Sequence, residues 1–385
     1  MEGQALKLLR RYLMKIKSVI LKMILSLFYP FSKLQKVHPD RITFISLEHD
    51  YLSKDFKLIY DQLQDKRFGK YDIKMALFKF EPSFLGNIKY GFACIRQLFL
   101  IQSSRLVILD FNNFVVSNFR HKQDVKVLQL WHATGALKQF GNRVDRDYVI
   151  KNYDYSIVNS YFFKSIYAKA FNMYEDQIMV TGIPDNDKNF DSIVIKQNKA
   201  RLLKAYPQLA HKRVITYAPT FRGRIGTEFK EVAIDLKQLR QELGDKYIII
   251  YKPHPLISNS AYKDDPNVLF IEDEPVPAIF SVTDILVTDY SAITIDWMAF
   301  DKPTVAYVPD LDNYAHKPGL NINYETDFPG PVVRDENQLA GAIKSANSDV
   351  DQKKRQQFTN KVYEFTDGKA TQRVAEFVRS IVSPS

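Results

Sequence analysis

The chain has 385 residues, of which 45% are hydrophobic and 25% are charged. This composition excludes a disordered chain, a collagen-like repeat and a simple coiled coil, and the length predicts two or three domains. Its 54 basic and 44 acidic residues give a net charge of +10, which favours an anionic partner: nucleic acid, anionic lipid or a phosphorylated substrate. The single cysteine, Cys94, excludes an intramolecular disulfide framework and a cysteine-based zinc site.

The first forty residues are both basic and apolar, with eight basic residues against two acidic ones. Apolar residues recur there at spacings of three and four, which predicts an amphipathic helix. The longest uncharged stretch, 23–32, is about half of the roughly twenty residues that a membrane-spanning helix needs, and the segment lacks the features of a signal peptide. We expect residues 1–38 to lie on an anionic membrane surface, with a helix packed on the protein body as the alternative. The basic candidates for membrane contact are Lys7, Arg10, Arg11, Lys15, Lys17 and Lys22.

After Asp40, short apolar runs typical of strands alternate with segments of helical spacing. This alternation predicts βαβ units with parallel sheets. The first series has expected strands at 42–47, 71–78, 106–109, 125–130, 155–158 and 178–180, and expected helices at 54–63, 87–102 and 164–171. The second has expected strands at 214–217, 247–251, 268–271, 285–287 and 304–308, and expected helices at 236–243, 278–282 and 292–300.

Two doubly wound α/β domains are therefore predicted, facing each other across a cleft. The polar segment 186–208 is the expected linker between them, and residues 336–382 are expected to be helical. The predicted boundaries are 1–38 for the basic segment, 39–195 and 196–355 for the two domains, and 356–385 for a C-terminal helix. In such folds ligands bind at the carboxyl ends of the strands, so polar motifs that follow strands are candidate sites.

The first such motif, WHATGALKQFG, follows the predicted strand 125–130. A neutral imidazole at His132 can act as a general base, because its ordinary pKa is near 6.5. Gly135 allows a ligand to approach the backbone closely, and Lys138 can neutralise a phosphate. The alternative is a histidine that merely packs or caps at a strand end.

Two more motifs follow strands of the second domain. In YAPTFRG, Thr220 can donate to a phosphate oxygen and Arg222 offers a planar guanidinium fork for phosphate. In YKPHP, two prolines stiffen the strand exit and hold Lys252 and His254 where an anion can meet them. The alternatives are a proline-containing turn with a surface arginine and a rigid exit loop.

The fourth motif, VTDYSAITIDW, runs from a buried strand into a helix. Asp289 or Ser291 is a candidate N-cap, and the free N–H groups at such a helix start favour a phosphate. Simple capping is the alternative. The chain lacks a P-loop and a GxGxxG fingerprint, which argues against a Walker NTPase and an ordinary dinucleotide enzyme. One motif in the first domain and three in the second suit a phosphorylated donor held mainly by the second, with the base supplied by the first.

At these residues the sequence resembles the CDP-glycerol glycerophosphotransferase family of wall teichoic acid synthesis. The resemblance covers about residues 40–380 and rests on WHATGALKQFG, TGIPDND, YAPTFRG, YKPHP and VTDYSAITIDW with DKPTVAYVPD. It implies a GT-B fold: an N-terminal Rossmann-like acceptor domain, a C-terminal Rossmann-like CDP-glycerol domain and a last helix that crosses back. It also implies a monotopic protein on the cytoplasmic face of the bacterial membrane, which transfers glycerol phosphate from CDP-glycerol to a lipid-linked acceptor and releases CMP.

The resemblance implies roles for individual residues. His132 matches the family's base, and His254 matches its second motif histidine, which holds the donor's phosphates; both are expected to be catalytic. Asp185 stands where the family often has arginine, so its loop is given no role. No compact acidic cluster is present, so neither a metal nor a cofactor is predicted. The expected donor-binding set is Gly135, Lys138, Thr220, Arg222, Lys252, Thr288, Asp289, Ser291, Ala292 and Asp296.

The WHATGA form and the compact length are more similar to the TagB-type primase than to the TagF-type polymerase. A primase acts on a ManNAc-GlcNAc-diphospho-undecaprenol acceptor, and the implied partners are this lipid, CDP-glycerol, anionic membrane lipids and other teichoic acid enzymes. The alternatives are a poly(glycerol phosphate) polymerase, a GT-B transferase that uses CDP-ribitol or a nucleotide sugar, and a non-catalytic membrane or nucleic-acid binding module. Because more than half of the net positive charge lies in one amphipathic segment and no nucleic-acid motif is present, no nucleic acid partner is expected.

Overall fold

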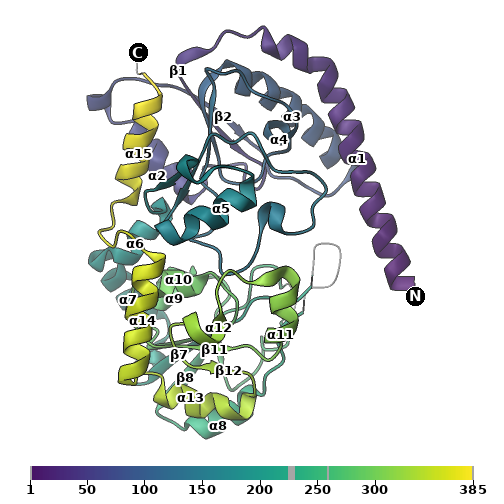
Figure 1. The fold of residues 1–385 in the computed structure, drawn as a ribbon. Coiled ribbons are helices and arrows are strands. Elements are labelled where there is room, and N and C mark those ends of the chain that lie inside the picture. The colour runs from purple at the N-terminus through teal and green to yellow at the C-terminus, as the bar shows by residue number, and fades with distance from the viewer. Residues whose placement is uncertain (1, 224–229, 258–259, 384–385) are drawn as a thin grey trace. The chain divides into compact units, whose positions relative to one another are not determined.

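The computed structural model describes residues 2–223, 230–257 and 260–383 and divides into two α/β units. Unit 1 consists of Met1–Ala133, Phe140–Asp187 and Lys369–Ser385, and unit 2 of Thr134–Gln139 and Lys188–Gly368. Each unit is built on a six-stranded parallel sheet (Figure 1). The sequence predicted a parallel sheet in each unit, with six strands in the first but only five in the second.

The sheet of unit 1 has the strand order β2-β1-β3-β4-β5-β6. Its strands carry near-continuous apolar runs, because helices cover both faces of a parallel sheet. The order reverses between β1 and β3, and this topological switch point is where folds of this kind bind ligands. The strands are β1 His38–Ser46, β2 Asp72–Leu77, β3 Ser104–Leu109, β4 Lys126–Gln129, β5 Tyr155–Val158 and β6 Ile178–Val180. The helices are α1 Glu2–Lys33, α2 Lys54–Leu63, α3 Phe84–Ser103, α4 Phe114–Asn118, α5 Lys164–Phe171 and α15 Ala370–Ile381.

The sheet of unit 2 has the order β12-β11-β10-β7-β8-β9, and its switch point lies between β7 and β10. Its strands are β7 Arg213–Ala218, β8 Tyr247–Tyr251, β9 Leu269–Phe270, β10 Ile285–Thr288, β11 Thr304–Tyr307 and β12 Val332–Val333. After the short α6 Asp187–Phe190, its helices are α7 Ser192–Ala205, α8 Leu236–Leu243, α9 Val276–Phe280, α10 Ile293–Met298, α11 Leu311–Tyr314, α12 Tyr324–Asp327, α13 Leu339–Ser345 and α14 Asp349–Val362.

The segment expected as a linker, 186–208, is helical instead. The Asp191 side chain caps α7 by accepting the N–H groups of Ile193 and Val194 at 2.8 and 3.2 Å. Leu202 is fully buried and joins a core cluster with Leu209. A charged helix needs only such a narrow apolar stripe to pack against its unit. The boundary between unit 1 and unit 2 therefore precedes this helix, at residue 188 and not at the predicted residue 196.

The C-terminal segment is divided between the units. Helix α14 belongs to unit 2, whereas α15 lies beside α2 in unit 1 (Figure 1). Val374 and Val378 of α15 enter the unit 1 core, and Arg373 Nε donates to the Thr181 carbonyl at 2.8 Å. The crossing back therefore occurs after Gly368, and not at the predicted residue 356.

Helix α1 packs against α3 through a narrow stripe. In that stripe Leu25 is fully buried and the Tyr29 hydroxyl donates to the Arg120 carbonyl at 2.8 Å. The opposite side is apolar and exposed, with Leu27 at 70% and Phe31 at 62% exposure. Among the described helices, none is long and apolar enough to cross a membrane.

Candidate active site

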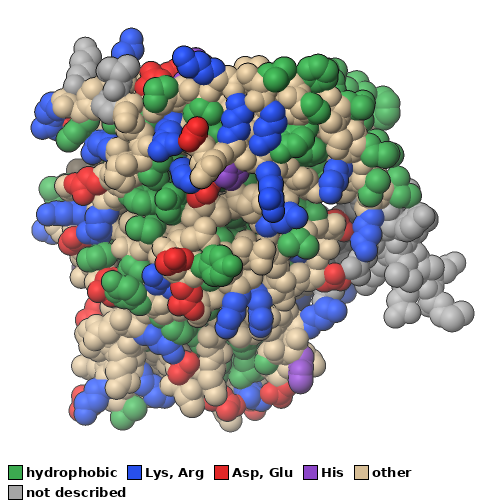
Figure 2. All heavy atoms as spheres, turned by 45° about the horizontal axis from the view of Figure 1, so that its top comes forward, with side chains coloured by type: hydrophobic (Ala, Val, Ile, Leu, Met, Phe, Trp, Pro, Cys, Tyr) green, Lys and Arg blue, Asp and Glu red, His purple; other side chains and the backbone are tan. Residues whose placement is uncertain are grey.

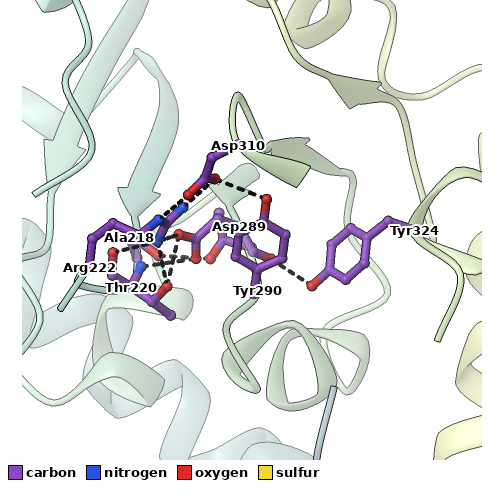
Figure 3. A network of polar contacts seen from close by, with 8 residues as sticks. Ala218, Thr220, Arg222, Asp289, Tyr290, Asp310 and Tyr324 are labelled. Atoms are coloured by element: carbon purple, nitrogen blue, oxygen red, sulfur yellow. Dashed lines mark hydrogen bonds and ion pairs between the residues drawn. The ribbon is translucent and has the colours of Figure 1, made fainter. Parts of the chain in front are cut away.

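A polar network joins the carboxyl ends of β7 and β10 at the switch point of unit 2 (Figure 3). Asp289, 1% exposed, accepts the backbone N–H of Thr220 through Oδ1 and its hydroxyl through Oδ2, each at 2.9 Å. The buried Thr288 hydroxyl donates to the Ala218 carbonyl at 2.7 Å. Asp289 therefore ties two strand exits together and does not cap the helix that follows it, as had been one expectation.

Arg222 lies between two carboxylates in this network (Figure 3). Its Nε and Nη2 donate to the two oxygens of Asp310 at 2.7 and 3.0 Å, and its Nη1 donates to Asp289 at 2.8 Å. Burial opposes the charge, but the carboxylates outweigh it and raise the pKa of Arg222 above its ordinary value. The guanidinium fork that the sequence assigned to phosphate is thus engaged by the protein, so Arg222 acts first as a positioning residue.

Tyrosine rings complete the network. The guanidinium lies over the rings of Tyr290 and Tyr314, 5.1 and 5.0 Å from their centroids, and these two rings stack at 3.8 Å. The Tyr290 hydroxyl donates to Asp310, and that of Tyr324 donates to the Asp289 carbonyl. Sequence reasoning gave none of these partners a role, although Tyr290 lies in VTDYSAITIDW and Asp310 ends DKPTVAYVPD, close behind a predicted strand.

The first motif is divided between the two units. His132 belongs to unit 1, whereas the segment 134–139 is held by unit 2. The Asn321 side-chain amide donates to the carbonyls of Ala136 and Lys138 at 3.0 and 2.8 Å, and Thr134 donates to Asp296 at 2.5 Å. Asp296, which the sequence predicted to bind the donor, therefore accepts a hydrogen bond from Thr134 of the protein itself. This contact also places the buried Gly135 and its neighbour Lys138 in unit 2 with the motifs of the second sheet.

Lys138 supplies a cation to this part of unit 2. Burial lowers the pKa of its ammonium group, the Asp289 carboxylate opposes that shift, and Arg222 adds to it. Within the described residues, no hydrogen bond or ion pair holds the Lys138 ammonium. A half-buried cation without a fixed anion is a favourable position for a phosphate group.

A backbone hydrogen bond and a ring contact orient the imidazole of His254. Its Nδ1 accepts the N–H of Leu256 at 3.2 Å, so in the neutral ring the proton is on Nε2. The imidazole meets Phe221 edge to face at 4.6 Å. Burial, with a smaller contribution from Lys138, lowers the pKa of His254 to about 4. At neutral pH this residue is a neutral Nε2–H donor and not a cation.

The remaining predicted donor residues of unit 2 are placed as follows. Lys252 donates to the Glu272 carbonyl, beyond β9, and burial lowers its pKa against the pull of Asp273 and Glu272. The Lys252 ammonium group is therefore held outside the network around Asp289. Ser291 Oγ accepts the Ile293 N–H at 3.4 Å, and Ala292 is the N-cap residue of α10 and provides no side-chain cap.

In unit 1, the chain turns sharply just before His132. Trp131 has a positive φ of 66°, a conformation that costs a residue with a side chain about 1–3 kcal/mol. Its N–H donates to Gln129 Oε1 at 2.8 Å, and its ring packs on Phe140 and Phe171 at 5.0 and 5.4 Å. This packing holds the strained residue and directs His132 outward.

His132 is fixed by ring contacts. Its imidazole stacks on Phe111 at 4.3 Å with 14° between the planes, and it touches the Trp131 ring at 4.0 Å. The residue keeps solvent access, yet burial of the imidazole lowers its pKa to about 4. His132 is therefore an unprotonated base at neutral pH, as a general base requires.

The expected membrane residues lie on α1. Lys15, Lys17 and Lys22 are exposed there, whereas the side chains of Lys7, Arg10 and Arg11 lie outside the described part of the structure. Across the residues that the structure describes, no group of three or more His, Cys, Asp or Glu side chains is placed to hold a metal ion.

Comparison with known proteins gives a consistent result. The family model described as CDP-glycerol:poly(glycerophosphate) glycerophosphotransferase matches residues 27–380. A teichoic acid ribitol-phosphate primase of Bacillus spizizenii is 30% identical over 368 residues, 91% of this chain and 94% of that protein. A teichoic acid glycerol-phosphate primase of Bacillus subtilis is 28% identical over 307 residues, 75% and 77% of the two chains. The predicted resemblance is thus confirmed.

Solved structures support the fold. The wall teichoic acid polymerase TagF superposes with a TM-score of 0.70 at 24% identity, covering 97% of both chains. A UDP-GlcNAc 2-epimerase of Methanocaldococcus jannaschii superposes with a TM-score of 0.52 at 11% identity, covering 88% of this chain and 99% of that one. The chain therefore has a GT-B-like fold with two parallel six-stranded sheets.

Proposed function

The chain belongs to the CDP-glycerol:poly(glycerophosphate) glycerophosphotransferase family, and from this premise we propose that it primes wall teichoic acid. The reaction moves glycerol phosphate from CDP-glycerol to an undecaprenyl-diphosphate-linked ManNAc-GlcNAc disaccharide and releases CMP. The observation that carries the proposal is the grouping of Lys138, His254 and the Asp289 network at the switch point of unit 2, joined by one motif to the base His132.

Unit 2 supplies the donor site in this proposal. The Lys138 ammonium neutralises the diphosphate of the donor, and the Nε2–H of His254 donates to one of its oxygens. Arg222 and Asp289 fix the loop of Thr220, whose geometry then needs no rearrangement when the donor binds. Such preorganised donors stabilise the charge that develops on a transferring phosphoryl group.

Unit 1 supplies the base. The acceptor hydroxyl attacks the β-phosphorus of CDP-glycerol while His132 takes its proton. An oxygen–phosphorus bond forms to the acceptor, the bond to CMP breaks, and CMP leaves with the electron pair. Because the pKa of His132 is about 4, the imidazole is free to accept that proton at neutral pH.

The test is CMP release from CDP-glycerol with and without a short-chain analogue of the lipid-linked disaccharide, followed by product mass. Acceptor-dependent CMP and a mass gain of one glycerol phosphate are expected. A ladder of additions would show a polymerase instead, and no CMP release from any CDP-alditol would overturn the phosphotransferase proposal.

CDP-ribitol is the second candidate donor. The relative at 30% identity is a ribitol-phosphate primase, and it matches 94% of its own length. The same assay with CDP-ribitol decides between the two alditols, because the correct donor is the one with the higher kcat/KM at saturating acceptor.

His254 is expected to act in donor binding. Replacing His254 with alanine removes one hydrogen bond to a charged phosphate, which is worth about 1.5–3 kcal/mol, so kcat/KM for the donor should fall about 10- to 100-fold. Glutamine keeps an N–H donor and should recover part of the loss. The kcat/KM for the donor is obtained for the unmodified protein, H254A and H254Q from the rate of CMP release at increasing donor concentration. Equal defects in both variants, or none, would contradict the assigned hydrogen bond.

We propose that the exposed apolar side of α1 inserts into an anionic membrane surface. Figure 2 shows hydrophobic side chains gathered at the upper right, where α1 and α3 lie. Helix α3 adds Phe84, Leu85 and Phe92, exposed by 80, 66 and 69%. The contact of α1 with unit 1 uses the opposite stripe, so the alternative of a helix packed by its broad apolar side is disfavoured.

Liposome flotation tests this surface. Glutamate at both Leu27 and Phe31 places two charges in the apolar face and is expected to reduce the fraction bound to phosphatidylglycerol vesicles at least tenfold. Val350, 63% exposed on α14 of unit 2, provides the matched control, and V350E should float like the unmodified protein. Unchanged binding of the double variant would contradict the proposal.

A further inference from the structure

A row of four rings crosses the carboxyl end of the unit 1 sheet. Tyr51 and His49 follow β1, with ring centroids 5.1 Å apart; Phe111 follows β3 and lies 6.2 Å from His49. Phe111 in turn stacks on His132, which follows β4, at 4.3 Å. We call Tyr51, His49, Phe111 and His132 the ring row. It spans the switch point between β1 and β3, the position in this sheet where a ligand is expected.

Carboxylates flank the ring row. Asp110 is 3% exposed, and the Ser53 hydroxyl donates to its Oδ2 at 3.1 Å. Its Oδ1 has no hydrogen-bond partner within the described chain, and burial raises the pKa of the carboxyl to about 6. Glu48 is exposed, next to His49. An unpaired buried oxygen is costly, and proteins keep such groups mainly where they serve a function.

Rings beside acidic groups match the chemistry of a sugar. The C–H face of a pyranose is apolar and packs on aromatic rings, and its hydroxyls donate to carboxylates beside those rings. A phosphate group fits this place poorly, because Asp110 and Glu48 would repel it. A linear alditol chain has no ring face to stack.

We propose that the ring row is the subsite for a pyranoside acceptor, whose terminal hydroxyl it brings to His132. The inference rests on the proposed function, since it names the acceptor class for that base. It also favours a sugar-terminated acceptor over a poly(alditol phosphate) chain.

Tyr51 offers a clean test, because its side chain is 61% exposed and its loss leaves the core intact. The probe is the soluble disaccharide ManNAc-GlcNAc, titrated into the full chain by calorimetry or ligand-observed NMR. Replacing Tyr51 with alanine removes one stacking surface and is expected to raise the dissociation constant about tenfold. The control is Y174A: Tyr174 is 80% exposed and precedes β6, at the amino end of the same sheet.

Two outcomes would contradict the proposal that the ring row binds a pyranoside acceptor. One is disaccharide binding that Y51A and Y174A leave equally unchanged, or weaken equally. The other is failure of the unmodified chain to bind the disaccharide while it binds a glycerol phosphate oligomer. Both are distinct from failure of the proposed function, which is absence of CMP release from any CDP-alditol; sugar binding is measured without a donor and does not depend on that assay.

Discussion

Replacing His132 with glutamine is expected to lower kcat by about 100- to 10,000-fold while CDP-glycerol binding changes little, because a general base contributes by that amount to proton transfer. Glutamine keeps a polar side chain of similar reach but cannot accept the proton. The measurements are CMP release at saturating acceptor and calorimetric titration of the donor. His211, exposed in unit 2 outside every motif, gives the control variant H211Q, which should retain full turnover.

The pH dependence gives an independent check on the same residue. A base with a lowered pKa is unprotonated above that pKa and is lost as the pH falls through it. Burial lowers the pKa of His132 to about 4, so the acid limb of kcat/KM should lie near pH 4 to 5 and not near 6.5. An acid limb at 6.5 that disappears in H132Q would contradict this environment for the imidazole, and equal loss of binding and turnover would make His132 a donor-binding residue.

The sequence predicts the two sheets because their strands are short apolar runs separated by helical spacing. Elements that lack this contrast between short apolar runs and helical spacing are not predicted from the sequence. Helix α7 has four basic residues among its fourteen and buries only Leu202, so its segment resembles a linker. Strand β12 has two residues, Val332–Val333, too few for any period to show.

The site is predictable to the extent that parallel strands bring their carboxyl ends together. This reasoning selects Thr220 and Asp289, which the structure joins directly. It does not identify Asp310, which also follows a predicted strand, as the partner that holds Arg222 from 88 positions further along the chain. Spacing along the chain carries no information about such a partner, because it depends on which strands become neighbours.

The same limit explains the divided first motif. Nothing in WHATGALK indicates that Lys138 is held by Asn321, 183 positions away, while His132 remains with the other unit. Nor does the sequence show that the fork of Arg222 is already occupied. An arginine after a strand is compatible with phosphate binding and with an internal ion pair, and only the neighbouring carboxylates decide between them.

Loss of the Asp289 carboxylate is expected to be the most destabilising single change in unit 2. The side chain is 1% exposed and accepts hydrogen bonds from the Thr220 N–H, the Thr220 hydroxyl and Arg222 Nη1. Replacing Asp289 with alanine leaves these donors unpaired and removes one of the two carboxylates beside the Arg222 guanidinium, which then keeps only its pair with Asp310 within the described residues. Breaking a buried pair in this way costs about 3–5 kcal/mol of the free energy of unfolding. Donor affinity should fall with it, because the loop of Thr220 loses its fixed geometry.

Urea denaturation followed by circular dichroism measures the loss as a lower midpoint at an unchanged slope. Asp312 provides the matched control, because it pairs with Arg334 at 3.1 Å in the same unit but is 82% exposed. Solvent screens such a pair, so D312A should cost less than about 1 kcal/mol. If D289A lowers the free energy of unfolding no more than D312A, Asp289 is not the group that holds the two strand exits together. If D289A instead retains donor affinity despite the lost stability, the network supports the fold of unit 2 without shaping the donor site.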